Sequence, residues 1–265
     1  MKKKYLFFDL DGTLTDPEEG ITKSVQYALR AFGIEVEDRK KLVPFIGPPL
    51  RDSYMEYYGF TSEQAGEGIT KYREYFTDKG WKQNKVYPGI PQMLKELKAA
   101  GYRLMVATSK PEVFSVRILK YFGLDSYFDF IGGADLEETR VKKGDIIKYV
   151  LEENGITEKD SVLMVGDRMH DAIGAEEAGV ECVGVLFGYG SREELEAVRY
   201  AVSCGCRLVA TVHGESLEDI KKKPVLKEMF EEGIFQRYIL LDCQGHIGHV
   251  AGIYDGAGKK EEAYG

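Results

Sequence analysis

Short apolar runs alternate with segments of helical periodicity along most of the chain. A short apolar run between polar residues predicts a strand buried on both faces, and apolar residues at every third or fourth position predict a helix. The expected strands are 5–8, 104–107, 128–131, 162–165 and 182–187, with helices at 90–100 and near 146–151 between them. This order predicts an α/β fold whose core is a Rossmann-like parallel sheet covered by helices.

Residues 16–82 interrupt this alternation. Ile21, Val25 and Leu29 recur at helical spacing, the segment 51–76 is rich in Tyr and Phe, and a Gly-Pro-Pro sequence at 47–49 separates the two. No strand pattern is visible in this interval, so we predict an α-helical cap inserted after the first strand, with the core formed by 1–15 and 83–198. Such an insertion lies over the carboxyl ends of the strands, where open α/β sheets bind ligands.

Residues 199–265 form a C-terminal extension with its own pattern. Its hydrophobic pattern predicts strands at 207–212 and 238–241 and helices at 216–220 and 224–232, which together make a small α/β unit. Two interpretations remain open. The extension is a fusion in which 207–212 supplies an edge strand to the sheet, or it is an interaction appendage. The strand-then-helix order of 207–220 favours the fusion.

The composition limits the function classes. The chain has 265 residues, and 36 basic against 44 acidic side chains give a net charge of −8. This acidic balance argues against nucleic-acid binding, which needs a basic field, and favours small-molecule chemistry. No apolar run reaches the roughly 20 residues of a membrane helix, and the first run ends at Asp9, too early for a signal peptide. Four cysteines without secretory features indicate reduced thiols, so we expect a cytoplasmic protein that does not contact membranes.

Two pairs of aspartates follow predicted strands. Asp9 and Asp11 come directly after the first strand, and Asp167 and Asp171 follow the strand at 162–165. Carboxylates gathered at one edge repel one another unless a cation neutralises them, and oxygen ligands without His or Cys favour magnesium over zinc. Each Asp alone also fits a helix N-cap, but the two pairs together favour a magnesium site.

A hydroxyl and an ammonium group complete the predicted site. Thr108 and Ser109 follow the strand at 104–107, and Lys143 begins the helix before the strand at 162–165. Side chains of these types bind the oxygens of a phosphoryl group. Lys142 is an adjacent alternative to Lys143, and either lysine alone is compatible with an ordinary solvated surface.

These motifs together resemble a known family. In order, Asp9-Leu10-Asp11-Gly12-Thr13, Thr108, Lys143 and Gly166-Asp167-Arg168-Met169-His170-Asp171 resemble the four signature motifs of the haloacid dehalogenase superfamily of phosphohydrolases. The resemblance covers about residues 1–196. The helical insertion is similar to the small α-helical cap of that superfamily, and residues 45–50 resemble its phosphoglycolate phosphatase-like branch.

The resemblance implies an aspartyl-phosphate mechanism. Asp9 would attack phosphorus, and Asp11 would protonate the leaving alcohol and then activate water. Magnesium would be held by Asp9, the Asp11 carbonyl and Asp167, with Asp171 orienting the site. Thr108 and Lys143 would hold the transferring oxygens, and backbone amides near Leu10 to Gly12 would add donors. The implied substrate-binding residues of the core are Gly12, Thr13 and Ser109.

Substrate choice is expected to lie in the cap, where Phe45, Ile46, Gly47 and Arg51 are candidate contacts. We predict a Mg²⁺-dependent phosphatase acting on a small phosphorylated metabolite, a phosphoglycolate-like phosphomonoester. A nucleoside monophosphate and a sugar phosphate also fit. The alternatives are a phosphomutase with the same core and a non-enzymatic binding or scaffold protein. The sequence carries no signal for an oligomeric state.

Residues 195–254 resemble the carboxyl end of the stage III sporulation AA ATPase. The chain contains no Gly-rich phosphate loop followed by Lys and Ser or Thr, so we expect no ATP hydrolysis by the extension. The extension also gathers Cys and His residues that offer zinc-ligand chemistry: Cys204, Cys206, His213, Cys243, His246 and His249. Their spacings match no common zinc finger, and small buried side chains are the favoured interpretation of the cysteines.

Overall fold

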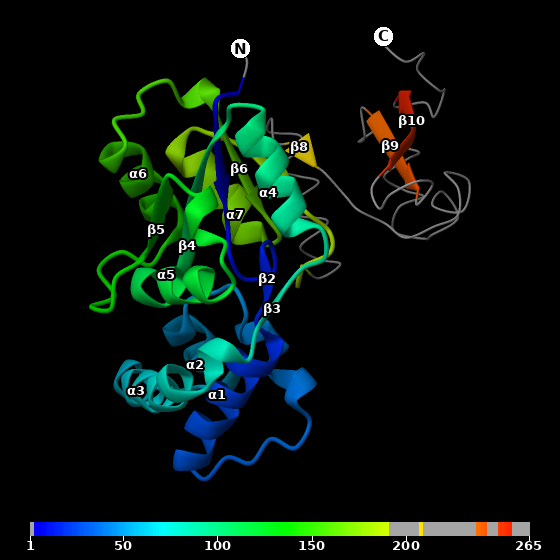
Figure 1. Cartoon of the computed structure of the whole chain (residues 1–265). Helices are drawn as coiled ribbons and strands as arrows, with labels where there is room; N and C mark the ends of the chain where they lie inside the picture. The colour runs from blue at the N-terminus through cyan, green and yellow to red at the C-terminus, as the bar shows by residue number, and fades with distance from the viewer. Residues whose placement is uncertain (1–2, 191–206, 209–236, 243–248, 256–265) are drawn as a thin grey trace.

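The core of the molecule is a parallel sheet. The computed structural model describes residues 3–190, 207–208, 237–242 and 249–255, and the strands of its main sheet lie in the order β5-β4-β1-β6-β7-β8 (Figure 1). In that order they are Phe130–Ala134, Arg103–Pro111, Tyr5–Phe8, Val162–Gly166, Glu181–Gly184 and Arg207–Leu208. Every pairing between them is parallel, so the predicted α/β fold is confirmed.

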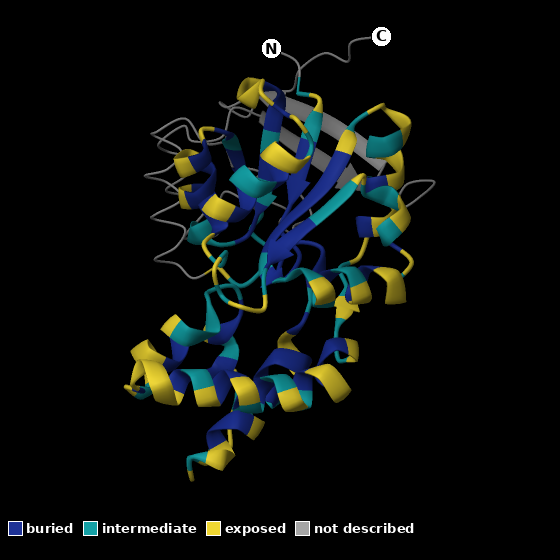
Figure 2. Ribbon diagram, turned by 90° about the vertical axis from the view of Figure 1, so that its left-hand side faces the viewer, coloured by how far each residue is buried: buried dark blue, intermediate teal, exposed yellow. Residues whose placement is uncertain are grey.

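Helices cover both faces of the sheet. Side chains of a strand point alternately to its two faces, and accordingly Leu6 and Phe8 join one hydrophobic cluster while Phe7 joins the other. Helices α4 (Ile90–Ala99) and α5 (Glu112–Tyr121) contribute to the first cluster, and α6 (Lys143–Glu153) and α7 (Met169–Ala178) to the second. The short 3₁₀ helices Asp125–Tyr127 and Lys159–Ser161 precede β5 and β6. The strands are therefore buried between two helical layers (Figure 2).

The cap is helical and lies at the carboxyl edge of the sheet, below the core in Figure 1. Its helices are α1 (Glu18–Ala31), α2 (Leu50–Tyr58) and α3 (Ser62–Asp78), with the 3₁₀ helices Arg39–Phe45 and Gly80–Lys82. The chain enters the cap through β2 (Thr15–Asp16) and leaves it through β3 (Lys85–Val86), which pair antiparallel. Helix α3 begins with a capping box of Thr61 and Gln64, which satisfies two otherwise unpaired amides.

Some strand boundaries differ from the sequence-based expectations. Strand β4 continues to Pro111 instead of ending at 107, because its polar residues find partners at the sheet edge. Strand β5 begins at Phe130, β7 ends at Gly184, and the pair β2–β3 was not expected. None of the described helices is long and apolar enough to cross a membrane.

The described parts of the extension are three strands. Strand β8 pairs in parallel with β7 at the edge of the main sheet, and β9 (Arg237–Asp242), which includes the strand expected at 238–241, pairs antiparallel with β10 (His249–Asp255). The helices expected at 216–220 and 224–232 lie outside the described residues, as do Cys204, Cys206, His213, Cys243 and His246. The domain boundaries and the role of the extension stay predictions.

A close backbone contact fixes the start of α1 against the end of the cap. The Gly20 amide donates to the Gln83 carbonyl at 2.9 Å, and a Cβ at position 20 would lie 2.0 Å from the Gly80 carbonyl oxygen. Backbone atoms cannot move aside as a flexible side chain can, so only glycine fits here.

We therefore expect Gly20→Ala to lower the free energy of unfolding by about 1–3 kcal/mol through overpacking. Gly66→Ala in α3 is the matched control, because an added Cβ there meets nothing closer than Arg51 nitrogens at 3.6 and 3.7 Å, and alanine is the better helix former by about 0.5–1 kcal/mol. Urea denaturation measures both. Equal losses in the two variants would contradict this packing.

Candidate active site

The register of the sheet brings the motif residues to one edge. Phe8 of β1 pairs with Val106 of β4 and with Val165 of β6. The residues just beyond these positions are Asp9, Thr108 and Asp167, and all three are buried. Since parallel strands end at the same edge, side chains that are distant in sequence converge here.

Asp9, Asp167 and Asp171 form a cluster of buried carboxylates. One oxygen atom from each lies within 4.8 Å of the others. Asp171 is in the first turn of α7, where its Oδ2 accepts a hydrogen bond from the Arg168 amide at 3.0 Å. A Cβ at Gly166 would lie 2.2 Å from the Asp171 Cγ, so glycine permits this approach.

Lys143, the first residue of α6, pairs with two of these carboxylates. Its Nζ lies 2.8 Å from Asp9 Oδ1 and 2.7 Å from Asp171 Oδ1, and it donates to the Ala107 carbonyl at 3.2 Å. Burial lowers the pKa of Lys143, but the charges of Asp171 and Asp9 outweigh burial, and the net pKa is raised. Lys142 is exposed at the N-cap of the helix, so the structure brings Lys143 to the site.

Asp167 is enclosed by backbone on two sides. Its Oδ1 accepts a hydrogen bond from the Thr13 hydroxyl at 3.0 Å, and its Oδ2 accepts one from the Tyr189 amide at 2.8 Å. A Cβ at Gly12 or at Gly188 would lie 2.1 or 2.2 Å from Asp167 Oδ2. Two glycines from distant parts of the chain are therefore needed to admit this carboxylate.

The cluster is short of positive charge. Burial, and then the charges of Asp171 and Asp9, raise the pKa of Asp167 to about 8. Burial also raises the pKa of Asp171 to about 6, although Lys143 opposes it. Oxygen-only donors, close spacing and a repulsion that the single charge of Lys143 offsets only in part fit a hard divalent cation.

Asp11 stands apart from this cluster and has its own lysine. Lys110 Nζ lies 2.5 Å from Asp11 Oδ2, and the Lys110 side chain is 5% exposed. Lys110 lies two residues after Thr108 in β4, and the Thr108 hydroxyl accepts a hydrogen bond from the Lys110 amide at 3.3 Å. Burial raises the pKa of Asp11, and Lys110 opposes this effect.

Three predicted substrate contacts in the core have other surroundings. The Gly12 amide donates to the Thr15 carbonyl at 2.8 Å, so in this conformation it closes a turn rather than facing a ligand. The Thr13 hydroxyl is bound to Asp167. Ser109 is half-buried and lies where the register between β4 and β5 shifts, between Thr108 and Pro111.

Two of the cap candidates pack within the protein. The Phe45 ring is buried among the rings of Tyr54, Tyr57 and Tyr58, with centroids 5.1, 5.6 and 6.0 Å away. Contact with a substrate would require the Phe45 ring to leave this cluster. Gly47, a candidate substrate contact, instead lies against Arg168 of the core, because a Cβ at 47, where φ is +106°, would lie 3.0 Å from Arg168 Cγ. The Arg168 guanidinium also donates to the Ile46 carbonyl, so these residues join cap to core.

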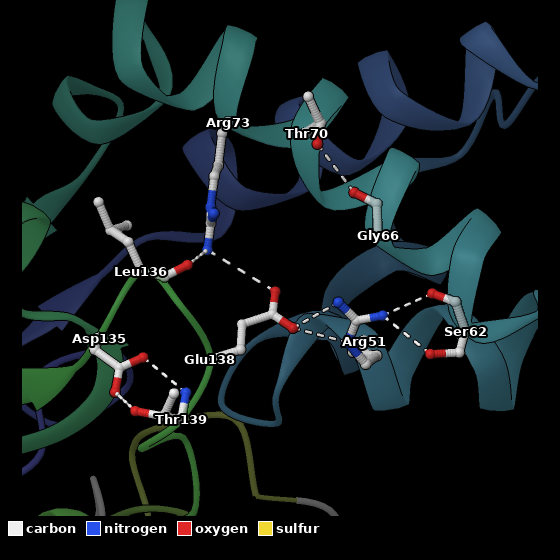
Figure 3. A network of polar contacts seen from close by, with 9 residues as sticks. All are labelled: Arg51, Ser62, Gly66, Thr70, Arg73, Asp135, Leu136, Glu138 and Thr139. Atoms are coloured by element: carbon white, nitrogen blue, oxygen red, sulfur yellow. Dashed lines mark hydrogen bonds and ion pairs between the residues drawn. The ribbon is translucent and has the colours of Figure 1, made fainter.

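Arg51, a further cap candidate, is held by a loop of the core (Figure 3). Its Nε and Nη2 each lie 2.7 Å from Glu138 Oε2, and its Nη1 donates to the Ser62 carbonyl at 2.6 Å. Arg73 of α3 lies 3.9 Å from Glu138 Oε1 and donates to the Leu136 carbonyl at 3.2 Å. Glu138 has φ +60°, an uncommon conformation for a residue other than glycine. The loop between β5 and α6 thus binds α2 and α3 of the cap.

Sequence reasoning missed several residues of this site. Lys110 has a signal, since it lies only two residues after Thr108 of the motif, but ending the predicted strand at 107 concealed it. Gly188 and Tyr189 have none, because they lie beyond the last motif and reach Asp167 only in the folded chain.

Buried carboxylates spaced to suit a cation, a further carboxylate paired with its own lysine, and a helical cap at the same edge of the sheet are typical of a phosphoryl-transfer enzyme of α/β fold. The model of the haloacid dehalogenase-like hydrolase family matches residues 6–185. The chain belongs to this family and is a phosphatase. A second family model, sporulation stage III protein AA, matches residues 181–261, as the resemblance of the extension implied.

Individual relatives cover most of the catalytic part. The chain is 47% identical over 192 residues to a 5'-nucleotidase of Pseudomonas aeruginosa, a match that covers 72% of this chain and 86% of the relative. It is 38% identical to the tyrosine-protein kinase PtkA of Mycobacterium tuberculosis, over 72% of this chain and 65% of the relative. The crystal structure of a predicted phosphatase from Clostridium acetobutylicum is similar with a TM-score of 0.75 and 45% identity, over 86% of this chain and 100% of the other.

The raised pKa of Asp167 predicts a pH-dependent stability. Between the usual pKa of Asp, near 3.8, and its folded value of about 8, the folded protein binds more protons than the unfolded chain, so stability falls as pH rises. We expect the melting temperature of the metal-free protein to fall between pH 6 and 8, and to fall less in Asp167→Asn. Asp145→Asn, at an exposed position, is expected to keep the wild-type slope. The same slope in all three proteins would contradict the raised pKa.

The contact between Arg51 and Glu138 predicts a measurable coupling between cap and core. In a double-mutant cycle of alanine variants, we expect about 1 kcal/mol of coupling, since the pair is partly shielded and linked by two nitrogens. The control is Arg30 and Glu35, with side chains 54% and 70% exposed, where we expect at most about 0.5 kcal/mol. Denaturant titration measures both cycles, and equal couplings would contradict a stabilising contact between Arg51 of the cap and Glu138 of the core.

Proposed function

We propose that this phosphatase is Mg²⁺-dependent and hydrolyses a small phosphomonoester through an aspartyl-phosphate intermediate. The observation that carries the proposal is that two neighbouring carboxylates, Asp9 and Asp11, have different surroundings. Asp9 belongs to the cluster of buried carboxylates and pairs with Lys143, whereas Asp11 lies outside that cluster and pairs with Lys110. Two carboxylates in different surroundings suit a nucleophile and an acid-base group.

In the first step an Asp9 carboxylate oxygen forms a bond to phosphorus while the bond from phosphorus to the ester oxygen breaks. Asp11 gives its proton to the leaving oxygen, and its pKa, raised by burial, favours carrying that proton. Lys143 orients Asp9 through Oδ1, and the Thr108 hydroxyl lies at the same edge to bind a phosphoryl oxygen.

In the second step Asp11 takes a proton from water, the water oxygen bonds to phosphorus, and the bond to Asp9 breaks to release phosphate. Asp9, Asp167 and Asp171, with the Asp11 carbonyl, would hold Mg²⁺, which when bound offsets the negative charge of the phosphoryl oxygens and the carboxylates. The cap excludes bulk water from these groups.

The substrate is proposed as a small phosphorylated metabolite. The 47% identical relative is named a 5'-nucleotidase, which favours a nucleoside monophosphate, whereas the motif around Gly47 resembles phosphoglycolate phosphatases. Phosphate release from both compounds separates them, and a product that keeps its phosphate at a new position would indicate a phosphomutase. The cytoplasmic location stays a prediction.

Asp9→Asn removes the proposed nucleophile and is expected to reduce phosphate release from p-nitrophenyl phosphate by at least roughly 1,000-fold in the presence of Mg²⁺. The matched control is Asp145→Asn, at an exposed position of α6, which is expected to keep wild-type turnover. Retained activity in Asp9→Asn, with the variant still folded by circular dichroism, would rule out the aspartyl phosphate.

A further inference from the structure

A buried lysine outside the motif positions binds the proposed acid-base group. Lys110 Nζ lies 2.5 Å from Asp11 Oδ2, and both side chains are less than 10% exposed. Among the described residues no other lysine or arginine forms an ion pair with Asp11. Asp11 Oδ1 is buried and has no hydrogen-bond partner among the residues that the structure describes. One oxygen of Asp11 is thus fixed and the other is left for a ligand.

Two lysines divide the carboxylates of the site into two groups. Lys143 binds Asp9 and Asp171, which belong to the cluster of buried carboxylates. Lys110 binds Asp11 alone and holds its side chain outside that cluster. Without a positive charge on its own side, the Asp11 carboxylate would be drawn toward the cation that the other three carboxylates require.

The cap completes the surroundings of Lys110. The Phe76 ring of α3 lies 4.9 Å from Lys110 Nζ, within the range of a cation–π contact. Tyr72, also of α3 and buried, stacks on Phe76 with centroids 5.3 Å apart. The ammonium group therefore lies between a core carboxylate and a cap ring, which leaves it little freedom to move.

We propose that Lys110 is a positioning residue for proton transfer, holding Asp11 by Oδ2 so that Oδ1 meets the leaving oxygen. This inference rests on the proposed function. In the step concerned, the bond from phosphorus to the ester oxygen breaks as Asp9 bonds to phosphorus, and the proton of Asp11 passes to the leaving oxygen. Lys110 exchanges no proton. It fixes the place from which Asp11 delivers one.

The proposal makes a prediction about leaving groups. An alkoxide needs its proton as the ester bond breaks, whereas p-nitrophenolate leaves with little help, so misplacing Asp11 slows the first much more than the second. We expect Lys110→Met to lower kcat/KM by about 100-fold for benzyl phosphate and by less than about tenfold for p-nitrophenyl phosphate, two substrates of similar size. Lys110→Arg keeps the charge and is expected to recover part of the loss on benzyl phosphate.

Lys120→Met, at an exposed position of α5, is the control and is expected to leave both rates unchanged. The readout is the ratio of the two kcat/KM values, which does not depend on the folded fraction of a variant. Phe76→Leu removes the ring but keeps an apolar side chain, and is expected to shift the ratio in the same direction by less.

Equal losses on both substrates in Lys110→Met would overturn the positioning role while leaving the phosphatase mechanism intact. An unchanged ratio in Lys110→Arg together with a changed ratio in Lys110→Met supports a role for the positive charge. Activity in Asp9→Asn would instead overturn the mechanism on which the inference rests, so the two failures are distinguishable.

Discussion

Repulsion among buried carboxylates is the interaction on which the other features of this molecule depend. Four aspartates are brought to one edge of the sheet and removed from water, where each negative charge disfavours the others. The fold answers with two buried lysines, with amide and hydroxyl donors to Asp167, and with a cluster spacing that suits a cation. Much of the sequence near the site follows from these requirements. Glycine occupies the positions where a Cβ would clash with an aspartate side chain. The two lysines occupy positions from which their ammonium groups contact the carboxylates.

The sheet and the cap make different contributions to this arrangement. The parallel register fixes the positions of Asp9, Thr108 and Asp167 along the strand direction, because the strand residues before them are paired with one another. The cap reaches the core through side chains: Arg51 and Arg73 at Glu138, the Arg168 contact with the Ile46 carbonyl, and the Phe76 ring over Lys110. Backbone pairing gives the sheet edge that carries the motif residues a rigid geometry, whereas side-chain contacts of this kind can be broken and remade.

The sequence predicted the parallel sheet and the helical cap because both rest on periodic burial, which is visible residue by residue. It also predicted the aspartates and Lys143 that converge in the structure, because motifs at strand ends meet at one edge. It did not predict Lys110, since a strand that stays extended through Thr108 and Lys110 is not apolar there. The partners of Arg51 were also missed. Glu138 reaches it through a loop with a positive φ, and no local pattern indicates such a conformation for a glutamate.

Tyr189 gives the junction between the two matched families a structural meaning. The hydrolase family model ends at residue 185 and the sporulation model begins at 181, yet the Tyr189 amide binds Asp167 and its hydroxyl binds Asp16 in β2, at the entrance to the cap. Gly188 makes room for the same carboxylate. The boundary between the two sequence families therefore runs close to the residues that enclose Asp167. A truncation after residue 185 would therefore remove Gly188 and Tyr189, and with them the contacts to Asp167 and Asp16, although it would keep every residue that the hydrolase family model matches.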